Sequence, residues 1–188
     1  MEILRTANAG VLLTFDGVTA LFDGVCDDFS VYEKTPENIK NYLMQNPPDI
    51  VAYTHTHKDH YDQSFITNYE KTTLRSAIGP EGSLLTSKNN VTVKGIYTRH
   101  IGSYEIDHVS FVIEADKCVW FMGDASPSEL KKLSGERKPD ILIAPYAYAN
   151  TASSWSRSLS TGAEKIIILH LPDEKKTNMK SEMQLKAL

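Results

Sequence analysis

Residues 54–62 read Thr-His-Thr-His-Lys-Asp-His-Tyr-Asp and follow the apolar run at residues 49–54, which is typical of a short buried strand. Four potential metal ligands fall within six consecutive positions of this loop: His55, His57, Asp59 and His60. Imidazole and carboxylate groups suit Zn²⁺ and the neighbouring transition-metal ions. Alternate residues of an extended turn can converge on one ion while the next pair faces a second, so the spacing predicts two ions. A solvated loop that happens to be rich in histidine is the alternative interpretation.

Strand and helix signals extend outward from this loop. Val11–Phe15 and Val18–Phe22 flank Asp16-Gly17, which predicts a two-residue hairpin. Residues 36–45 predict a helix with Thr35 as N-cap and Pro36 at the first helical position. Further strands are predicted at residues 91–98, 107–115, 118–122, 141–144 and 165–169, and helices at 126–135, from the capping-box spacing of Ser126 and Glu129, and at 153–160. Strands early and late with helices between them predict two sheets packed face to face, with helices outside.

The segment from His55 to His60 resembles the HxHxDH signature of the metallo-β-lactamase superfamily. Ala9-Gly10 and Leu21-Phe22-Asp23 also look like the N-terminal strands of that family, so the resemblance covers nearly the whole chain. It implies an α/β fold, the four-layer αβ/βα sandwich. The 188 residues match the size of one domain, and we expect a single hydrolase domain over residues 1–188. Within the superfamily, the short length and the sequence Asp59-His60-Tyr61-Asp62 look most like the small hydrolases related to ascorbate-6-phosphate lactonase.

The resemblance implies a complete ligand set. His100 follows a predicted strand, Asp124 stands in a Gly-Asp pair after another, and His170 ends a third. By the family pattern, one ion is held by His55, His57 and His100, the other by Asp59, His60 and His170, and Asp124 bridges them. His108 competes with His100 for the third position, and an ordinary strand histidine is the favoured interpretation of His108. A role behind the ligands or as a proton donor is a further alternative.

The implied activity is hydrolysis of a small ester, lactone or phosphodiester by a hydroxide that two metal ions generate. Asp59 is the predicted catalytic residue, which orients the hydroxide and takes a proton, and Asp62 is expected to brace a ligand. Zinc is the first choice of divalent ion, with Mn, Fe and Ni as alternatives. Asp23 and Cys26 follow an early predicted strand, and both are candidates to border the site. The alternatives are a turn residue for Asp23 and a half-buried thiol for Cys26. The competing hypothesis is a non-hydrolytic di-iron protein of the same fold with a redox or sensing role.

Composition limits the partners. The formal charge is −4 and no block of like charges exceeds two residues, which argues against a nucleic-acid footprint or a polybasic membrane anchor. With no leader-like N-terminus and no apolar run long enough to span a bilayer, we expect a cytoplasmic protein. Cys26 and Cys118 have no CxxC spacing and are expected to be free thiols. The expected substrate is a small anion, with Lys58 and Arg99 as candidate contacts and a homo-oligomer as a means of completing the pocket.

Overall fold

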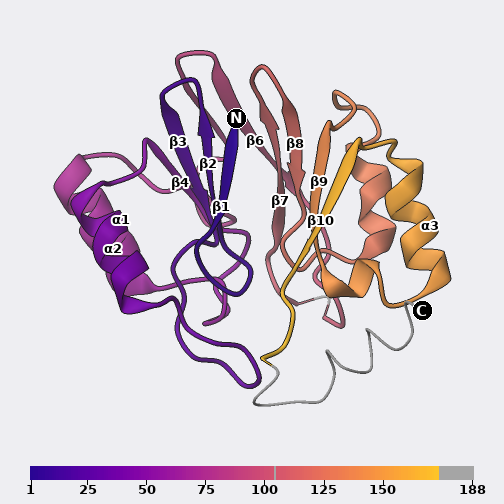
Figure 1. The fold of residues 1–188 in the computed structure, drawn as a ribbon, viewed down its shortest axis with the longest axis horizontal. Coiled ribbons are helices and arrows are strands. Elements are labelled where there is room, and N and C mark those ends of the chain that lie inside the picture. The colour runs from indigo at the N-terminus through magenta and orange to yellow at the C-terminus, as the bar shows by residue number, and fades with distance from the viewer. Residues whose placement is uncertain (104, 174–188) are drawn as a thin grey trace.

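Two β-sheets form the centre of the computed structural model, which describes residues 1–103 and 105–173 (Figure 1). The first sheet contains, in spatial order, β1 (Glu2–Arg5), β2 (Val11–Phe15), β3 (Val18–Phe22) and β4 (Ile50–Ala52). The second contains β10 (Lys165–Leu169), β9 (Ile141–Pro145), β8 (Cys118–Phe121), β7 (Val109–Glu114), β6 (Val91–Tyr97) and β5 (Leu85–Lys88). Helices α1 (Glu37–Gln45) and α2 (Gln63–Thr73) cover the outer face of the first sheet, and the 3₁₀ helix η1 (Pro127–Leu133) and α3 (Ala152–Ser160) cover the second. The predicted four-layer αβ/βα sandwich is confirmed.

The alternation of side chains along each strand explains why helices are needed on both outer faces. In β2, Leu13 faces the second sheet, whereas Leu12 packs under α1 and α2. Between the sheets, the ring of Phe22 lies 5.6 Å from that of Phe111 and 5.4 Å from that of Phe121. Burying each such ring contributes about 1.5 to 3 kcal/mol. A sheet with apolar side chains on both faces must therefore be covered on both.

The hairpin between β2 and β3 has the predicted turn. Phe15 pairs with Val18, and the two residues between them, Asp16 and Gly17, have φ angles of 34° and 81°. Positive φ at both central positions is the requirement of the tight hairpin turn that the Asp-Gly pair favours.

Helix α1 starts one residue later than expected. Pro36 occupies the N-cap position rather than the first helical position, and it makes no side-chain capping bond. The hydroxyl of Thr35 instead accepts a hydrogen bond from the backbone N–H of Cys26 at 2.9 Å. Thr35 therefore closes the loop after β3. The predicted role of Thr35 as the helix cap is wrong.

Helix α2 was not predicted. Its N-cap is Asp62, whose carboxylate accepts from the backbone N–H of Phe65 at 2.9 Å. The helix buries Phe65, Ile66 and Tyr69 on the face toward the first sheet. Among residues 1–103 and 105–173, no helix combines the length and apolar character that crossing a membrane requires.

Two edge strands and one cap also differ from expectation. β1 and β5 are largely exposed strands at sheet edges, so neither shows the continuous apolar run that predicts a buried strand. At η1, Ser126 makes no side-chain cap bond, and the carboxylate of Glu129 binds Arg99 instead of completing a capping box. The predicted helix is a 3₁₀ helix.

Candidate metal centre

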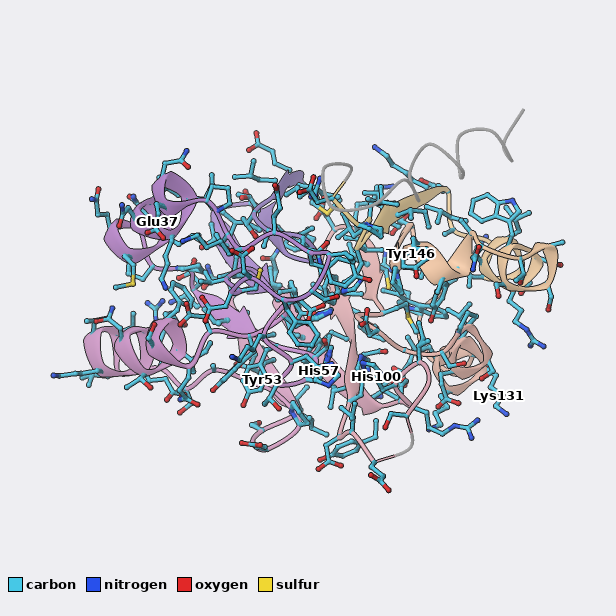
Figure 2. All side chains as sticks on the ribbon, turned by 90° about the horizontal axis from the view of Figure 1, so that it is seen from below. Glu37, Tyr53, His57, His100, Lys131 and Tyr146 are labelled. Atoms are coloured by element: carbon cyan, nitrogen blue, oxygen red, sulfur yellow. The ribbon has the colours of Figure 1, made fainter. Side chains whose placement is uncertain are left out.

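The predicted ligands meet where four strands of the two sheets end. They lie on the loop after β4, just beyond β6 and β8, and immediately after β10: His55, His57, Asp59, His60, His100, Asp124 and His170. Figure 2 shows His57 and His100 side by side between the N-terminal and C-terminal halves, and their ring centroids are 4.9 Å apart. The fold thus brings together residues that are up to 115 positions apart in the sequence (170 minus 55).

Three overlapping groups of side chains have ligand atoms within 4.8 Å of one another. They are His55, His57 and His100; His55, His60 and Asp124; and Asp59, His60 and His170. The first and third groups are the two sets that the family pattern assigns to separate ions. Two ligand atoms on one tetrahedral zinc ion lie roughly 3.4 Å apart, given Zn–N distances of about 2.0 to 2.1 Å. Small side-chain movements would bring the ligand atoms of each group to the distances that one ion requires. Metal binding by these residues stays a prediction.

Asp124 stands between the two sets. Its Oδ2 atom lies 3.4 Å from Nε2 of His60, 3.6 Å from Nε2 of His100 and 3.7 Å from Nε2 of His170. Burial raises the pKa of this carboxyl, but the charges of His60 and the neighbouring histidines outweigh burial and hold the pKa well below its usual range. Asp124 is therefore an anion within reach of ligands from both sets.

Hydrogen bonds to Nδ1 orient two of the histidines. The hydroxyl of Thr54 donates to Oδ2 of Asp23 at 2.7 Å, so it must accept the 3.0 Å bond from Nδ1 of His55. Nδ1 of His60 donates to the same carboxylate of Asp23 at 2.8 Å. Both rings therefore carry a proton on Nδ1 and direct Nε2 to the centre, so Nε2 is the atom that would bind a metal ion once it carries no proton.

The ring of His100 is also oriented by a hydrogen bond from Nδ1. Its Nδ1 donates to the carbonyl of Ile101 at 2.6 Å, which leaves Nε2 as the free ligand atom. A β-bridge pairs His100 with Ala125, and the N–H of Ile101 donates to the carbonyl of Asp124 at 2.8 Å. The backbone thus holds His100 and Asp124 next to each other.

The donor set fits divalent ions. Five buried side-chain atoms of the centre have no hydrogen-bond partner: Nε2 of His55, Oδ1 of Asp59, Nε2 of His60, Nε2 of His100 and Oδ1 of Asp124. A buried polar atom without a partner costs about 1 to 3 kcal/mol. Such a concentration of unpaired nitrogen and carboxylate atoms is what metal ions would satisfy.

The two buried histidines of the ligand loop have opposite pKa shifts. Burial lowers the pKa of His55 well below its usual value, and the charges of His60 and His108 act in the same direction. Burial also opposes the charged form of His60, but the carboxylates of Asp124 and Asp23 outweigh it and raise the pKa well above its usual value. Without metal, a proton on His60 therefore takes the place of a cation between these two acids.

His108 lies behind the ligands and does not join any of the three groups. Its Nε2 accepts the backbone N–H of Asp124 at 3.0 Å, and its Nδ1 is 2.8 Å from the hydroxyl of Thr98. Burial lowers the pKa of His108 to about 3, so the ring is neutral. With both nitrogens engaged, His108 positions Asp124, in line with the non-ligand interpretation that the sequence favoured.

Backbone conformation explains why a glycine precedes Asp124. Gly123 has a φ of 53°, and a Cβ atom there would lie 2.5 Å from Cγ2 of Thr54. Asp23 and His170 also have positive φ, 47° and 60°, which non-glycine residues adopt at a cost of about 1 to 3 kcal/mol each. The centre is built from backbone that the surrounding sheets hold in uncommon conformations.

Three residues at the border of the site have other roles than expected. Asp62, the expected brace, caps α2 and forms a salt bridge with Lys40. Asp23 is the brace, and the only sequence signal for this role was weak: its position directly after β3. Arg99, a candidate anion contact, donates from Nε to the buried carboxylate of Glu129 at 3.1 Å.

The two cysteines are buried free thiols, as expected. The Sγ atom of Cys26 lies 3.7 Å from the hydroxyl of Thr35. Burial raises the pKa of the Cys26 thiol, and burial likewise raises that of Cys118 to about 11. Neither thiol belongs to the ligand groups of the described residues.

Comparison with known proteins gives one family and many solved structures of the same fold. The profile described as "Beta-lactamase superfamily domain" matches residues 6–160. No curated protein matches the chain.

Three solved structures illustrate the structural likeness. An isothiocyanate hydrolase from Delia radicum gut bacteria is 17% identical with a TM-score of 0.69, over 100% of this chain and 91% of that one. A "possible metal-dependent hydrolase" from Veillonella parvula DSM 2008 is 18% identical with a TM-score of 0.66, over 90% and 84%. CmlA, a diiron beta-hydroxylase from Streptomyces venezuelae, is 14% identical with a TM-score of 0.54, over 90% and 44%. At these identities the likeness concerns the fold.

Proposed function

The chain belongs to the family of beta-lactamase superfamily domains, and we propose that it is a metal-dependent hydrolase of a small ester, lactone or phosphodiester. The observation that carries the proposal is the position of Asp124, whose Oδ2 lies within 3.7 Å of Nε2 atoms from both predicted ligand sets. The name of the Veillonella relative, a possible metal-dependent hydrolase, supports this class of reaction.

Seven side chains would hold two divalent ions. His55, His57 and His100 would bind the first, Asp59, His60 and His170 the second, and Asp124 both. When bound, two such ions would lower the pKa of their bound water to about 7 and polarise the scissile carbonyl or phosphoryl oxygen. Zinc is the first choice for this set of nitrogen and carboxylate ligands, with Mn, Fe and Ni as alternatives.

Asp59 is the proposed catalytic residue. Its Oδ2 lies 3.0 Å from Nε2 of His170, and its buried Oδ1 has no hydrogen-bond partner. Burial raises the pKa of Asp59, but the hydrogen bond from His170 and the charge of His60 outweigh it and lower the pKa. An ionised carboxylate with a free oxygen can orient the attacking water and accept its proton.

Asp23 and Thr54 would keep the ligands in place during the reaction. Both backbone N–H and hydroxyl of Thr54 donate to Asp23, each at 2.7 Å. The carboxylate of Asp23 therefore has three bonds, including that from His60, and cannot swing toward an ion. Holding the rings by their Nδ1 atoms leaves only Nε2 for metal binding.

A small anionic substrate is proposed because two divalent ions with the carboxylates of Asp59 and Asp124 and one hydroxide leave a net positive centre. Within the superfamily, we propose that the chain belongs with the small hydrolases related to ascorbate-6-phosphate lactonase. A single domain over residues 1–188 is likewise retained as a prediction. The pocket is either formed by one chain alone or completed by a second copy in a homo-oligomer.

A non-hydrolytic di-iron protein is the competing proposal, since CmlA, described as a diiron beta-hydroxylase, shares the fold. Histidine and carboxylate ligands alone serve zinc and iron equally well. Turnover assays separate the two proposals, because the hydrolase proposal requires turnover without any external reductant or oxygen. Metal analysis of protein purified without added metal identifies the ion in the same sample.

The test is a hydrolysis panel on one sample whose metal content is measured. It should contain small lactones, carboxylic esters, phosphodiesters, RNA and single-stranded DNA. We expect turnover of at least one small-molecule class and loss of that turnover with a chelator. Efficient metal-dependent cleavage of RNA without small-molecule turnover would contradict the substrate class, and activity that survives complete metal removal would contradict the proposal.

A further inference from the structure

The loop between β3 and α1 carries two aromatic residues to the metal centre, and the structure fixes that loop on two sides. The N–H of Asp27 donates to the carbonyl of Lys58 in the ligand loop at 2.8 Å. The N–H of Asp173, just beyond His170, donates to the carbonyl of Val31 at 2.9 Å. The loop is therefore attached to the two segments that supply ligands for the second ion.

Between these attachments a tight turn positions Phe29 and Tyr32. The N–H of Tyr32 donates to the carbonyl of Phe29 at 3.0 Å, and the intervening Ser30 has a φ of 55°. A bridge also pairs the two residues. The turn gives both aromatic side chains a defined place at the centre.

Each ring lies beside a different predicted ligand. The ring of Phe29 is 6.2 Å from that of His57 at an interplanar angle of 25°, a stacked arrangement. The ring of Tyr32 is 4.1 Å from that of His170 at 55°. His57 belongs to the set for the first ion and His170 to the set for the second. Each aromatic ring therefore lies beside one ligand of a different predicted metal site.

Phe29 is 43% exposed and belongs to none of the hydrophobic clusters of the described residues. Single exposed apolar side chains are common on protein surfaces and need no function. This one differs because it is stacked on a predicted ligand, next to the second ring. Its free face is an apolar surface at the place where a substrate would sit.

Arg99, one of the two expected cationic contacts, and a lysine of the loop between β3 and α1 are held by acidic side chains. Arg99 is engaged by the buried carboxylate of Glu129, with Nε 3.1 Å from Oε1. Lys34, on the same loop as Phe29, forms a salt bridge with Glu37 at 3.3 Å. The ring contacts recorded between this turn and the predicted ligands are those of Phe29 and Tyr32.

We propose that Phe29 and Tyr32 form a binding subsite for a planar apolar group, an aryl or arylalkyl substituent next to the bond that is cleaved. The inference rests on the proposed function and narrows its substrate class to small molecules with a polar reacting group and an aromatic body. Stacked and tilted aromatic pairs contribute roughly 0.5 to 1.5 kcal/mol beyond area burial, which corresponds to about a two- to tenfold change in affinity.

The test uses three phosphonates with the same anionic group: phenylphosphonate, cyclohexylphosphonate and ethylphosphonate. Calorimetric titration of the metal-loaded protein should give a Kd for phenylphosphonate about two- to tenfold lower than for the cyclohexyl compound, which matches it in size but is not planar. Ethylphosphonate should bind most weakly. Phe29→Ala should remove the preference for phenyl over cyclohexyl, and Phe29→Tyr should keep it. Tyr42→Ala, at a 51% exposed residue of α1, is the matched control and should change nothing.

Ethylphosphonate binding reports on the metal centre, and the ratio of phenyl to cyclohexyl affinity reports on the subsite. A protein that binds all three compounds equally, or keeps its preference in Phe29→Ala, overturns the subsite and leaves the hydrolase proposal intact. A protein with measured bound metal that binds none of them overturns the subsite as well, and hydrolysis data on the same sample then decide the proposed function separately.

Discussion

The carboxylate of Asp23 accepts a hydrogen bond from Nδ1 of His60 at 2.8 Å, with both side chains fully buried. It joins the end of β3 to the ligand loop across 37 positions of sequence. The bond fixes the tautomer of His60, and the neighbouring bonds to Thr54 fix the carboxylate. The binding energy of the second ion should therefore depend on a residue that does not touch it.

Asp23→Asn should weaken binding of the second metal ion by about 10- to 100-fold, the usual effect of losing such a supporting group. An amide in this place cannot accept all three hydrogen bonds. Competition with a chromogenic chelator measures the affinity. Asp27→Asn, at an exposed residue of the same loop, is the control and should bind as the wild type does. Equal affinities for the two variants would contradict the role of Asp23.

His100→Ala and His108→Ala should differ. His100→Ala removes a predicted ligand and should lose metal and activity together. His108→Ala should keep both ions but lose about 1 to 3 kcal/mol of unfolding free energy, because the buried N–H of Asp124 loses its acceptor. Metal content and urea denaturation measure the two effects. The reverse pattern would make His108 the ligand.

Gly123→Ala should destabilise the protein by about 2 to 6 kcal/mol, the sum of left-handed strain and overpacking. A methyl group there would meet Thr54 at 2.5 Å. Gly135→Ala is the matched control, since nothing lies within 4 Å of a Cβ at that residue, and it should stay within about 0.5 kcal/mol of the wild type. Chemical denaturation of both variants measures the difference, and similar values would show that Gly123 tolerates a side chain.

Affinity for the second ion should rise with pH. The pKa of His60 is raised well above its usual value by Asp124 and Asp23, which outweigh burial, so the metal-free protein binds a proton there more tightly than an ordinary histidine does. Metal binding at Nε2 must displace that proton. Raising the pH through the pKa of His60 removes the competition, and lowering it strengthens the competition. Calorimetric titrations in buffers of different ionisation enthalpy should detect proton release. Binding without proton uptake or release would contradict this picture.

The sequence was most informative where the chemistry is local. The ligand loop, the Asp-Gly hairpin and β10 are short continuous patterns, and each is found where the pattern predicted it. The brace on His60 was missed because Asp23 and Thr54 meet across 31 positions, and no periodicity encodes that contact. Helix α2 was missed for a related reason, since its cap Asp62 closes a ligand-rich loop and was interpreted as part of the site.

Long-range packing also decided the roles of charged residues near the site. Arg99 follows β6 and was considered a substrate contact, but the fold buries Glu129 beneath it, and the pair is only visible in three dimensions. Phe29 and Tyr32 gave no sequence signal, because their position depends on attachments to residues 58 and 173. The clustering of the candidate ligands could be predicted from their type and spacing, whereas the residues that position or surround them could not.

The central claim is a two-metal centre that drives hydrolysis, and metal titration of the chelator-treated protein tests it most directly. Zinc is added in steps to metal-free protein while bound metal and hydrolysis of the best substrate from the panel are measured in the same sample. We predict that activity rises until two equivalents are bound per chain, and that Asp124→Ala binds less metal and stays inactive at saturation. Full activity at one equivalent, activity without metal, or an active Asp124→Ala variant would contradict the account.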